Sequence, residues 1–373
     1  MKLKKYIYGV TMGALSLTLA SCYNSESEFP DYEGGTTAYF AYQFPVRTLI
    51  LGNDIYDNTI DNAHKCHIWA TMGGAYKGRD AVADIVVDES LCDNLWFVDA
   101  GGNPSEPVRP LPKDYYNLVG NTIPYNGDQR GYVEVQFTDA FFNDPKAKEN
   151  TYVIPLLMTG VKGIDHILTG TPREGLTPAR QNTGDWDVLA KDYVLYCVKY
   201  KNPWDAKYIR RGVDNVTEKG ATTTIIRKDF SLVNSDLEHY KENPVNQNDE
   251  VCGIVTKNMS QAIFPVSFKT SGASVPCNLI LTFNGDQCTI STDDEGVTVT
   301  GTGEFIEKGT ERSEYKDYQW GNNNGQPVQR DILRLSYNVN FADKDIQVTT
   351  NDTLVVQTRE SNKKEFFSPK YVK

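Results

Sequence analysis

The clearest pattern of apolar and polar positions lies near the C-terminus of the chain. In residues 333–341 the odd positions are apolar and the even positions are polar. This period of two predicts a half-buried antiparallel strand, because successive side chains of a strand point to opposite faces. Shorter strand-like segments accompany it at 262–268, 279–283, 297–300, 303–306 and 354–358. Sequential antiparallel strands with short turns predict an up-and-down barrel or a second sandwich.

The first half of the chain contains a similar series of strand-like segments. Turn-forming Gly, Pro, Asn and Asp residues separate the segments 37–42, 47–51, 67–71, 84–87, 132–137, 152–157 and 193–200. Such a series predicts a β-sandwich. Asn202-Pro203-Trp204 ends it, because proline cannot donate to a central strand and restricts the residue before it. We therefore expect two all-β domains, 36–203 and 204–373.

The N-terminal residues predict export and lipid attachment. Three lysines precede a short apolar run, and Leu19-Ala20-Ser21 leads into Cys22. This order is that of a signal peptide cleaved before a lipidated cysteine, and the run is too short to span a membrane comfortably. We expect a signal peptide at 1–21, then the lipidated Cys22 at the start of a flexible acidic tether, 22–35. Acyl chains on Cys22 would hold the protein on a membrane.

Charge excludes one class of partner. The net charge is −11 at pH 7, and it becomes more negative when the three lysines of residues 1–21 are removed. Such a chain repels phosphate backbones, so nucleic-acid binding is not expected. The 22 tyrosines far exceed the 5 tryptophans, as in β-rich proteins with functional loops.

Six cysteines remain once Cys22 is lipidated, and their spacings are scattered. We expect mostly free, buried thiols, because a chain of this length can fold on its core alone. Asn284-Gly285 predicts a hairpin between Cys277 and Cys288. A loop of those two residues would place Cys288 opposite Leu281, so this hairpin would not bring the two cysteines together.

The search for catalytic motifs is negative. The chain has no GxSxG, HExxH, P-loop or GxGxxG motif. His64 and His67 bracket Cys66, but a zinc site needs three or four convergent ligands. Paired carboxylates could hydrolyse glycosides, yet no spacing singles out a pair among the 49 acids. We expect no catalytic residue, no metal and no cofactor.

Aromatic residues in polar segments are the best binding candidates. Tyr315, Tyr318 and Trp320 lie within six residues, among Lys, Asp, Gln and Asn side chains and beside glycines. Sugar rings present CH faces that stack on such rings, while amides and carboxylates take the hydroxyls. The alternative is that Trp320 folds back onto its own loop. Trp96 is a weaker candidate because its neighbours are apolar, and Trp69, inside a strand, is expected in the core.

Several short motifs, taken in order, resemble those of a known family. They are Phe29-Pro30-Asp31-Tyr32, Phe44-Pro45-Val46-Arg47-Thr48, Val87-Asp88-Glu89-Ser90-Leu91, Leu111-Pro112-Lys113-Asp114-Tyr115-Tyr116 and the run 193–212. They resemble Bacteroidetes lipoproteins whose N-terminal domain is of the domain-of-unknown-function 1735 family, here joined to a lipocalin-like domain of the 4361 type. The resemblance implies an all-β fold, an immunoglobulin-like β-sandwich followed by a lipocalin-like antiparallel β-barrel.

The same resemblance implies a place in a polysaccharide-utilisation locus, beside an outer-membrane TonB-dependent importer and its lid lipoprotein. We therefore expect a lipid-anchored outer-membrane protein, facing the cell exterior, that binds a polysaccharide without cleaving it. Because the mature chain is acidic and repels polyanions, we expect this polysaccharide to be neutral or weakly charged. One alternative is an adhesin or structural lipoprotein that binds protein. The other is a glycoside hydrolase, although the family-18 signature DxxDxDxE of some relatives is missing from this sequence.

Overall fold

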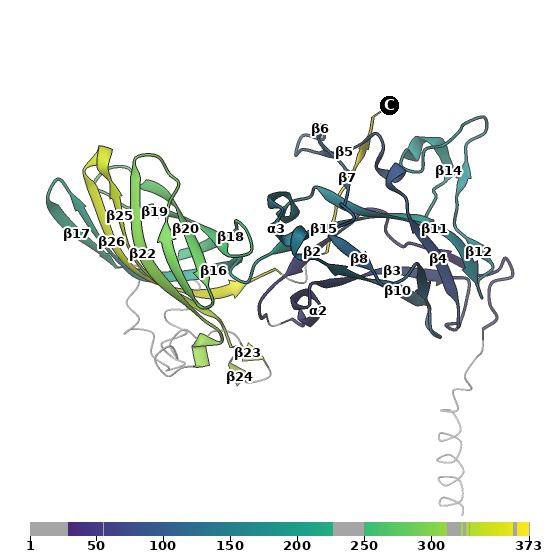
Figure 1. Cartoon of the computed structure of the whole chain (residues 1–373), viewed down its shortest axis with the longest axis horizontal. Helices are drawn as coiled ribbons and strands as arrows, with labels where there is room; N and C mark the ends of the chain where they lie inside the picture. The colour runs from purple at the N-terminus through teal and green to yellow at the C-terminus, as the bar shows by residue number, and fades with distance from the viewer. Residues whose placement is uncertain are drawn as a thin grey trace, which may run out of the picture.

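The computed structural model describes residues 29–54, 56–226, 250–311, 322–323, 326–327, 329–360 and 364–372. Figure 1 shows two β-rich domains side by side, a sandwich followed by a barrel. The expected all-β fold class is therefore confirmed. Among the described residues, no helix is long and apolar enough to cross a membrane. Cys22 lies outside them, so lipid attachment there stays a prediction.

The sandwich consists of two sheets that face each other. One has the order β12 (His166–Ile167), β1 (Thr37–Tyr39), β3 (Lys65–Gly73), β10 (Arg130–Phe137) and β8 (Tyr116–Leu118). The other has the order β27 (Glu365–Phe366), β2 (Pro45–Ile50), β15 (Tyr193–Lys201), β11 (Tyr152–Lys162), β4 (Val82–Val87) and β9 (Thr122–Pro124), with β7 (Arg109–Pro110) paired to β11.

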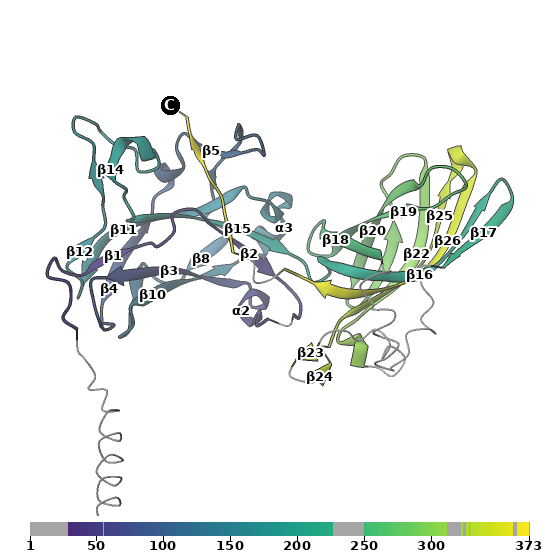
Figure 2. The ribbon, with the colours of Figure 1, turned by 180° about the vertical axis from the view of Figure 1, so that it is seen from behind.

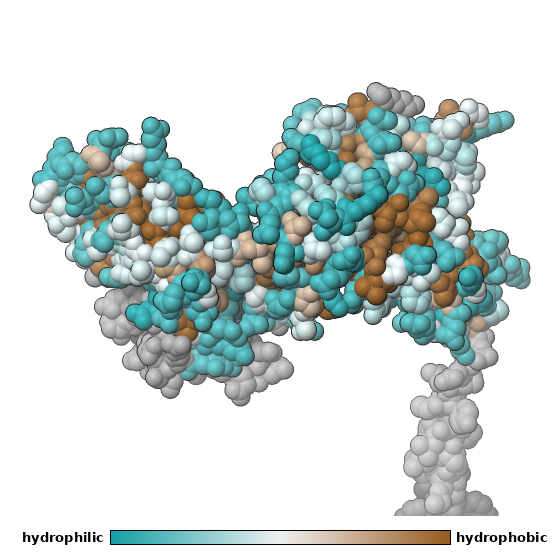
Figure 3. Space-filling model, viewed as in Figure 1, coloured by the Kyte–Doolittle hydropathy of each residue, from teal (hydrophilic) through white to brown (hydrophobic). Residues whose placement is uncertain are grey.

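Alternation along these strands builds the core between the two sheets. Cys66, Ile68 and Ala70 of β3 point inward, and so do Val133 and Val135 of β10. They pack in one buried cluster with side chains of β4, β11 and β15. Figure 3 shows hydrophilic residues over much of the visible surface, with apolar residues gathered on the sandwich around β4.

Short elements cover the ends and one outer face of the sandwich. A second apolar cluster lies there and includes Phe97, Trp186 and Phe367. The elements are α2 (Thr59–Asn62), α3 (Asp139–Asn143), η2 (Glu89–Cys92), η3 (Pro145–Lys148), η4 (Thr183–Asp185), the pair β13 (Thr171–Pro172) and β14 (Trp186–Val188), and the sheet β28 (Lys370–Tyr371), β5 (Leu95–Val98) and β6 (Pro104–Pro107).

The barrel is antiparallel, and the pairing of its first and last strands closes it. The order is β16 (Ala206–Glu218), β18 (Glu250–Thr256), β19 (Gln261–Phe268), β20 (Val275–Asn284), β21 (Gln287–Ser291), β22 (Val297–Ile306), β25 (Ile332–Phe341) and β26 (Ile346–Thr358), which pairs back with β16. β17 (Ala221–Ile226) pairs with the second half of β16. Short elements are η6 (Gly309–Glu311), η8 (Ala342–Lys344) and the pair β23 (Asn322–Asn323) and β24 (Gln326–Pro327).

Apolar and charged side chains fill the barrel together. β25 alternates as its sequence predicts, with its odd positions 333–341 buried. Among these inward residues, the guanidinium of Arg210 donates to Asp352 at 3.0 Å, to the Tyr337 hydroxyl at 3.0 Å and to Glu250 at 3.1 Å. A buried charge is tolerated only when it is paired and hydrogen-bonded. This network therefore ties β16, which carries Arg210, to β18, β25 and β26.

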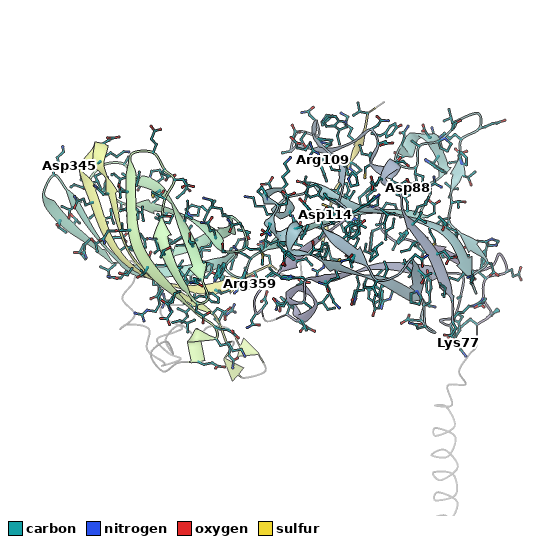
Figure 4. All side chains as sticks on the ribbon, in the orientation of Figure 1. Lys77, Asp88, Arg109, Asp114, Asp345 and Arg359 are labelled. Atoms are coloured by element: carbon teal, nitrogen blue, oxygen red, sulfur yellow. The ribbon has the colours of Figure 1, made fainter. Side chains whose placement is uncertain are left out.

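Buried polar groups join the two domains at the segment after β15. The Asn202 amide donates to the carbonyls of Asn258 at 2.9 Å and Gln261 at 2.8 Å, at the turn between β18 and β19. Arg359, which Figure 4 shows between the domains, donates to the carbonyls of Asn53 and Pro203 and to Asp331. Since Arg359 is 2% exposed, these bonds are shielded from water and fix the junction.

After the barrel, the chain returns to the sandwich. Figure 2 shows this segment leaving β26 and running along the sandwich to the C-terminus. We call residues 364–372 the C-terminal strap. Within it, β27 pairs with β2 and β28 pairs with β5. We expected the whole of 204–373 to belong to the barrel domain, and this prediction is wrong for the strap, because Phe367 is buried in a core of the sandwich.

The predicted hairpin exists, but with a different register. β20 and β21 are joined by Gly285 and Asp286, so Phe283 lies opposite Cys288, where Leu281 was expected. Gly285 has a φ of 62°, which a glycine adopts without strain at the first loop position. Cys66, Cys92, Cys197, Cys277 and Cys288 are buried free thiols, as expected. Burial raises the pKa of the Cys66 thiol to about 12.

Candidate binding site

The outward face of β3 and β10 carries a row of aromatic and charged residues. Lys65, His67, Trp69 and Thr71 alternate with the buried positions of β3. Across the strand pair, Trp69 lies opposite Tyr132 and His67 lies opposite Glu134. Because the register places like-facing residues side by side, two strands suffice to bring these side chains into one surface.

Three rings on this surface are in contact. The Trp69 and Tyr132 ring centroids lie 4.7 Å apart, and His67 stacks on Tyr132 at 4.0 Å with an interplanar angle of 22°. We call His67, Trp69 and Tyr132 the aromatic face. Trp69 is 48% exposed and Tyr132 is 40% exposed. Large rings that stay exposed in contact with each other form an apolar patch of the kind that marks a binding surface.

Charged groups hold the aromatic face in place. The Lys65 amine donates to Glu134 at 2.7 Å, and His67 lies 3.6 Å from the same carboxylate. The hydrogen bond from Lys65 lowers the pKa of Glu134 below its usual value. On the other side, the Arg130 guanidinium lies 5.6 Å from the Trp69 ring centroid. These contacts fix the rings and leave polar groups beside them.

A cleft of about 510 Å³ begins at Trp69 and enters between the two sheets. On β3, the strand β1 reaches only Thr71–Gly73. No described strand pairs with the same edge of β3 before Thr71, so that edge is open to the cleft. Ile68 and Ala70 of β3 line the cleft from one sheet, and Val194 and Tyr196 of β15 line it from the other. This volume is within the usual range for small-molecule sites, which are mostly apolar with a few polar groups.

The C-terminal strap completes the cleft. Phe366 lines it together with Tyr42, and the two ring centroids lie 4.9 Å apart. Phe366 is 53% exposed and Tyr42 is 59% exposed. The next residue, Phe367, points the other way and packs on Phe44 at 5.5 Å and Phe97 at 5.0 Å. The cleft therefore lies between two exposed aromatic groups that are far apart in sequence.

The structure locates only some of the residues that the sequence suggested. Cys22, Tyr315, Tyr318 and Trp320 lie outside the described residues, so their roles stay predictions. Trp96 lies half-buried on β5, in register with Lys370 of the strap and Pro107. Within the described residues there is no group of three or more His, Cys, Asp or Glu side chains arranged to hold a metal.

The expectation that Trp69 belongs to the core is wrong. The apolar residues Cys66, Ile68, Ala70 and Met72 all fall on even positions and face inward, which turns Trp69 outward. This signal was available in the sequence, because the odd positions of the same strand hold Lys65 and His67. Tyr132 could have been found in the same way, from inward Val133 and Val135. Phe366 had no such signal, since the strap pairs with strands about 300 residues earlier.

Fold and site together define a two-domain β-protein, a sandwich with an aromatic cleft followed by a closed barrel. A family model described as domain of unknown function 5627 matches residues 203–360, and a second, described as a "-like, N-terminal domain", matches residues 32–165. The sequence resemblance had indicated the 4361 type for the barrel, so the family name differs from the expected one. None of the curated proteins matches the chain.

A crystal structure from Bacteroides ovatus, described as a structural genomics protein of unknown function, is 39% identical to this chain. The match covers 92% of this chain and 100% of that one, with a TM-score of 0.77. This chain therefore belongs to the same protein family. A multidomain Bacteroides ovatus protein that includes domain of unknown function 1735 matches 86% of this chain and 94% of its own, at 10% identity and a TM-score of 0.40.

Proposed function

We propose that this protein binds a glycan at the aromatic face and the adjoining cleft, and does not cleave it. The observation that carries the proposal is the contact pair of Trp69 and Tyr132, which is exposed, fixed and next to a cleft of about 510 Å³. A sugar ring stacks its CH face on such a ring, and its hydroxyls bond to charged and polar groups at the side. Glu134, Lys65 and Arg130 provide such groups here.

The acids at the cleft favour binding over hydrolysis. Glu360 and Glu365 line it, and each is ion-paired with a lysine, Glu360 with Lys207 at 2.9 Å and Glu365 with Lys199 at 2.8 Å. A glycosidase needs one carboxyl group that stays protonated at neutral pH and can donate its proton. Both of these carboxylates are instead engaged by a lysine amine.

The proposal also places the protein on the outer membrane, facing the cell exterior. Its support is the sequence of residues 1–22, with Cys22 as the lipidated residue, and the family resemblance to lipoproteins of polysaccharide-utilisation loci. In that setting, the sandwich would capture polysaccharide and pass it to a TonB-dependent importer and its lid lipoprotein.

Affinity gel electrophoresis of the chain from residue 23 onward, against a panel of polysaccharides, tests the proposal. We expect at least one polysaccharide to retard the protein, and Trp69→Ala to weaken that binding about thirtyfold, since losing an aromatic anchor costs about 2 kcal/mol and 1.4 kcal/mol is tenfold. The melting temperature should hardly change, because the ring is half exposed.

Tyr76→Ala is the matched control, since Tyr76 is also 48% exposed but lies outside the cleft and the aromatic face. It should leave glycan binding unchanged. Equal binding by the Trp69 variant and the unmodified protein would refute the site. Release of reducing ends that depends on one Asp or Glu would refute a purely binding role.

A further inference from the structure

Both signs of charge surround the cleft, and most of the charges are neutralised in pairs. Lining residue Arg47 pairs with Asp61, and lining residue Lys201 pairs with Asp205 at 3.0 Å. The lining acids Glu360 and Glu365 each have a lysine partner, as described above. The Arg47 and Lys201 pairs therefore add no unpaired charge for a ligand to meet.

Two lining cations differ from the rest. Within the part of the chain that the structure describes, no carboxylate lies within ion-pair distance of Arg130 or of Lys364. Both side chains are exposed, one beside Trp69 on β10 and the other at the start of the C-terminal strap. The cleft therefore has a local positive excess on a protein whose net charge is −11.

Arg130 has the geometry of an anion-binding group next to a stacking surface. Its guanidinium lies 5.6 Å from the Trp69 ring centroid, so it is held close to where a stacked sugar would lie. A guanidinium presents planar N–H pairs that match the two oxygens of a carboxylate or sulfate. Lys364 adds a second positive charge, which acts on a bound anion as a point charge.

We infer that the ligand of the cleft is an acidic glycan, with a carboxylate or sulfate group on or next to the sugar that stacks on Trp69. This inference rests on the proposed glycan-binding function and names its substrate class. It differs from the neutral glycan expected from the net charge. The net charge acts over a distance and is screened within about 8 Å at physiological salt, whereas Arg130 and Lys364 act at contact.

The test compares acidic polysaccharides with their own neutral forms. Alginate, polygalacturonate and hyaluronan are offered before and after chemical reduction of their carboxyl groups to alcohols, and dextran sulfate is offered beside dextran. The full mature chain should bind at least one acidic member and lose about tenfold or more in affinity when its charge is removed. Binding should also weaken between 50 and 500 mM salt. The first three probes distinguish a carboxylate ligand from a sulfate ligand.

Single variants then test the acidic ligand separately from the proposed glycan-binding function. Arg130→Gln should bring the affinity ratio of the acidic to the neutral form close to one, whereas Arg173→Gln, which changes an exposed arginine outside the cleft, should leave the ratio unchanged. Binding of neutral polysaccharides alone, reduced by Trp69→Ala, would overturn the acidic ligand and leave the glycan-binding function standing. Failure to bind any polysaccharide would overturn both.

Discussion

The two domains place their aromatic side chains differently. In the barrel, Phe264, Phe268, Tyr337 and Phe341 point inward and are almost fully buried. Within the described residues, every large aromatic side chain that is exposed belongs to the sandwich, its N-terminal approach or the C-terminal strap. Both domains use the same alternation of apolar and polar positions. Among the described residues, the rings of the barrel therefore stabilise its core, whereas several rings of the sandwich remain exposed, as the proposed glycan site requires.

The contrast is strongest inside the barrel, where buried rings surround the charged network of Arg210. Arg210→Ala should destabilise the protein by about 3–5 kcal/mol, because Asp352 would be left buried without its cation. Urea denaturation monitored by circular dichroism measures this loss. Lys207→Ala on the same strand is the control, and it should cost about 1 kcal/mol or less, since the Lys207–Glu360 pair is at the surface. A loss below 1 kcal/mol for Arg210→Ala would mean that the network does not stabilise the barrel.

The C-terminal strap contains the same contrast in two adjacent residues. Phe367→Ala should cost about 3 kcal/mol, because it removes a ring that packs on Phe44 and Phe97. Phe366→Ala should change stability by less than about 0.5 kcal/mol, since the ring is half exposed. It should instead weaken glycan binding about fivefold, which corresponds to about 1 kcal/mol.

Thermal unfolding and affinity electrophoresis of the two strap variants provide the measurement. Each variant serves as the control for the other, because they change the same residue type at neighbouring positions. If Phe366→Ala lowers stability and leaves binding intact, the strap only fastens the domains together, and the cleft loses one of its two aromatic borders.

Local patterns predicted the strands well, because period two is a property of neighbouring residues. The buried odd positions of 333–341 follow from it. The hairpin was predicted from a different local signal, Asn284-Gly285, which gave its place but not its register, because the loop consists of Gly285 and Asp286. Pairings between distant segments were not predictable in this way. The strap is held beside β2 by strand pairing and by the burial of Phe367 in an apolar cluster of the sandwich, and no local pattern near residue 367 predicts these contacts. The cleft depends on this long-range contact, so sequence reasoning found neither it nor Phe366.

The wrong prediction that Trp69 lies in the core has a different cause. Its strand was predicted, but the ring was assigned to the core from its type, although the alternation of Cys66, Ile68 and Ala70 had already fixed which face is inward. Trp69 alternates with buried residues, and its neighbours on the same face of the strand are His67 and Thr71. A tryptophan in such a position is better interpreted as a surface ring. The same rule assigns Tyr132 to the outward face of β10.

Trp320 provides the last way to test the comparison between domains, with the smallest expected effect. The sequence predicted that Trp320, with Tyr315 and Tyr318, forms a stacking platform in the second domain. The cleft on the sandwich offers a second candidate site, whose lining residues the structure describes. If the sandwich alone binds the glycan, Trp320→Ala should change its affinity by less than about twofold, which is below 0.5 kcal/mol, while Trp69→Ala causes the large loss. Affinity electrophoresis of the two single variants and the double variant decides between a site on the sandwich and a site on the barrel.

A large loss of affinity in the Trp320 variant alone would transfer the site to the barrel. Large losses in both, adding up in the double variant, would show that one glycan chain contacts both domains, because effects at distant and independent sites add.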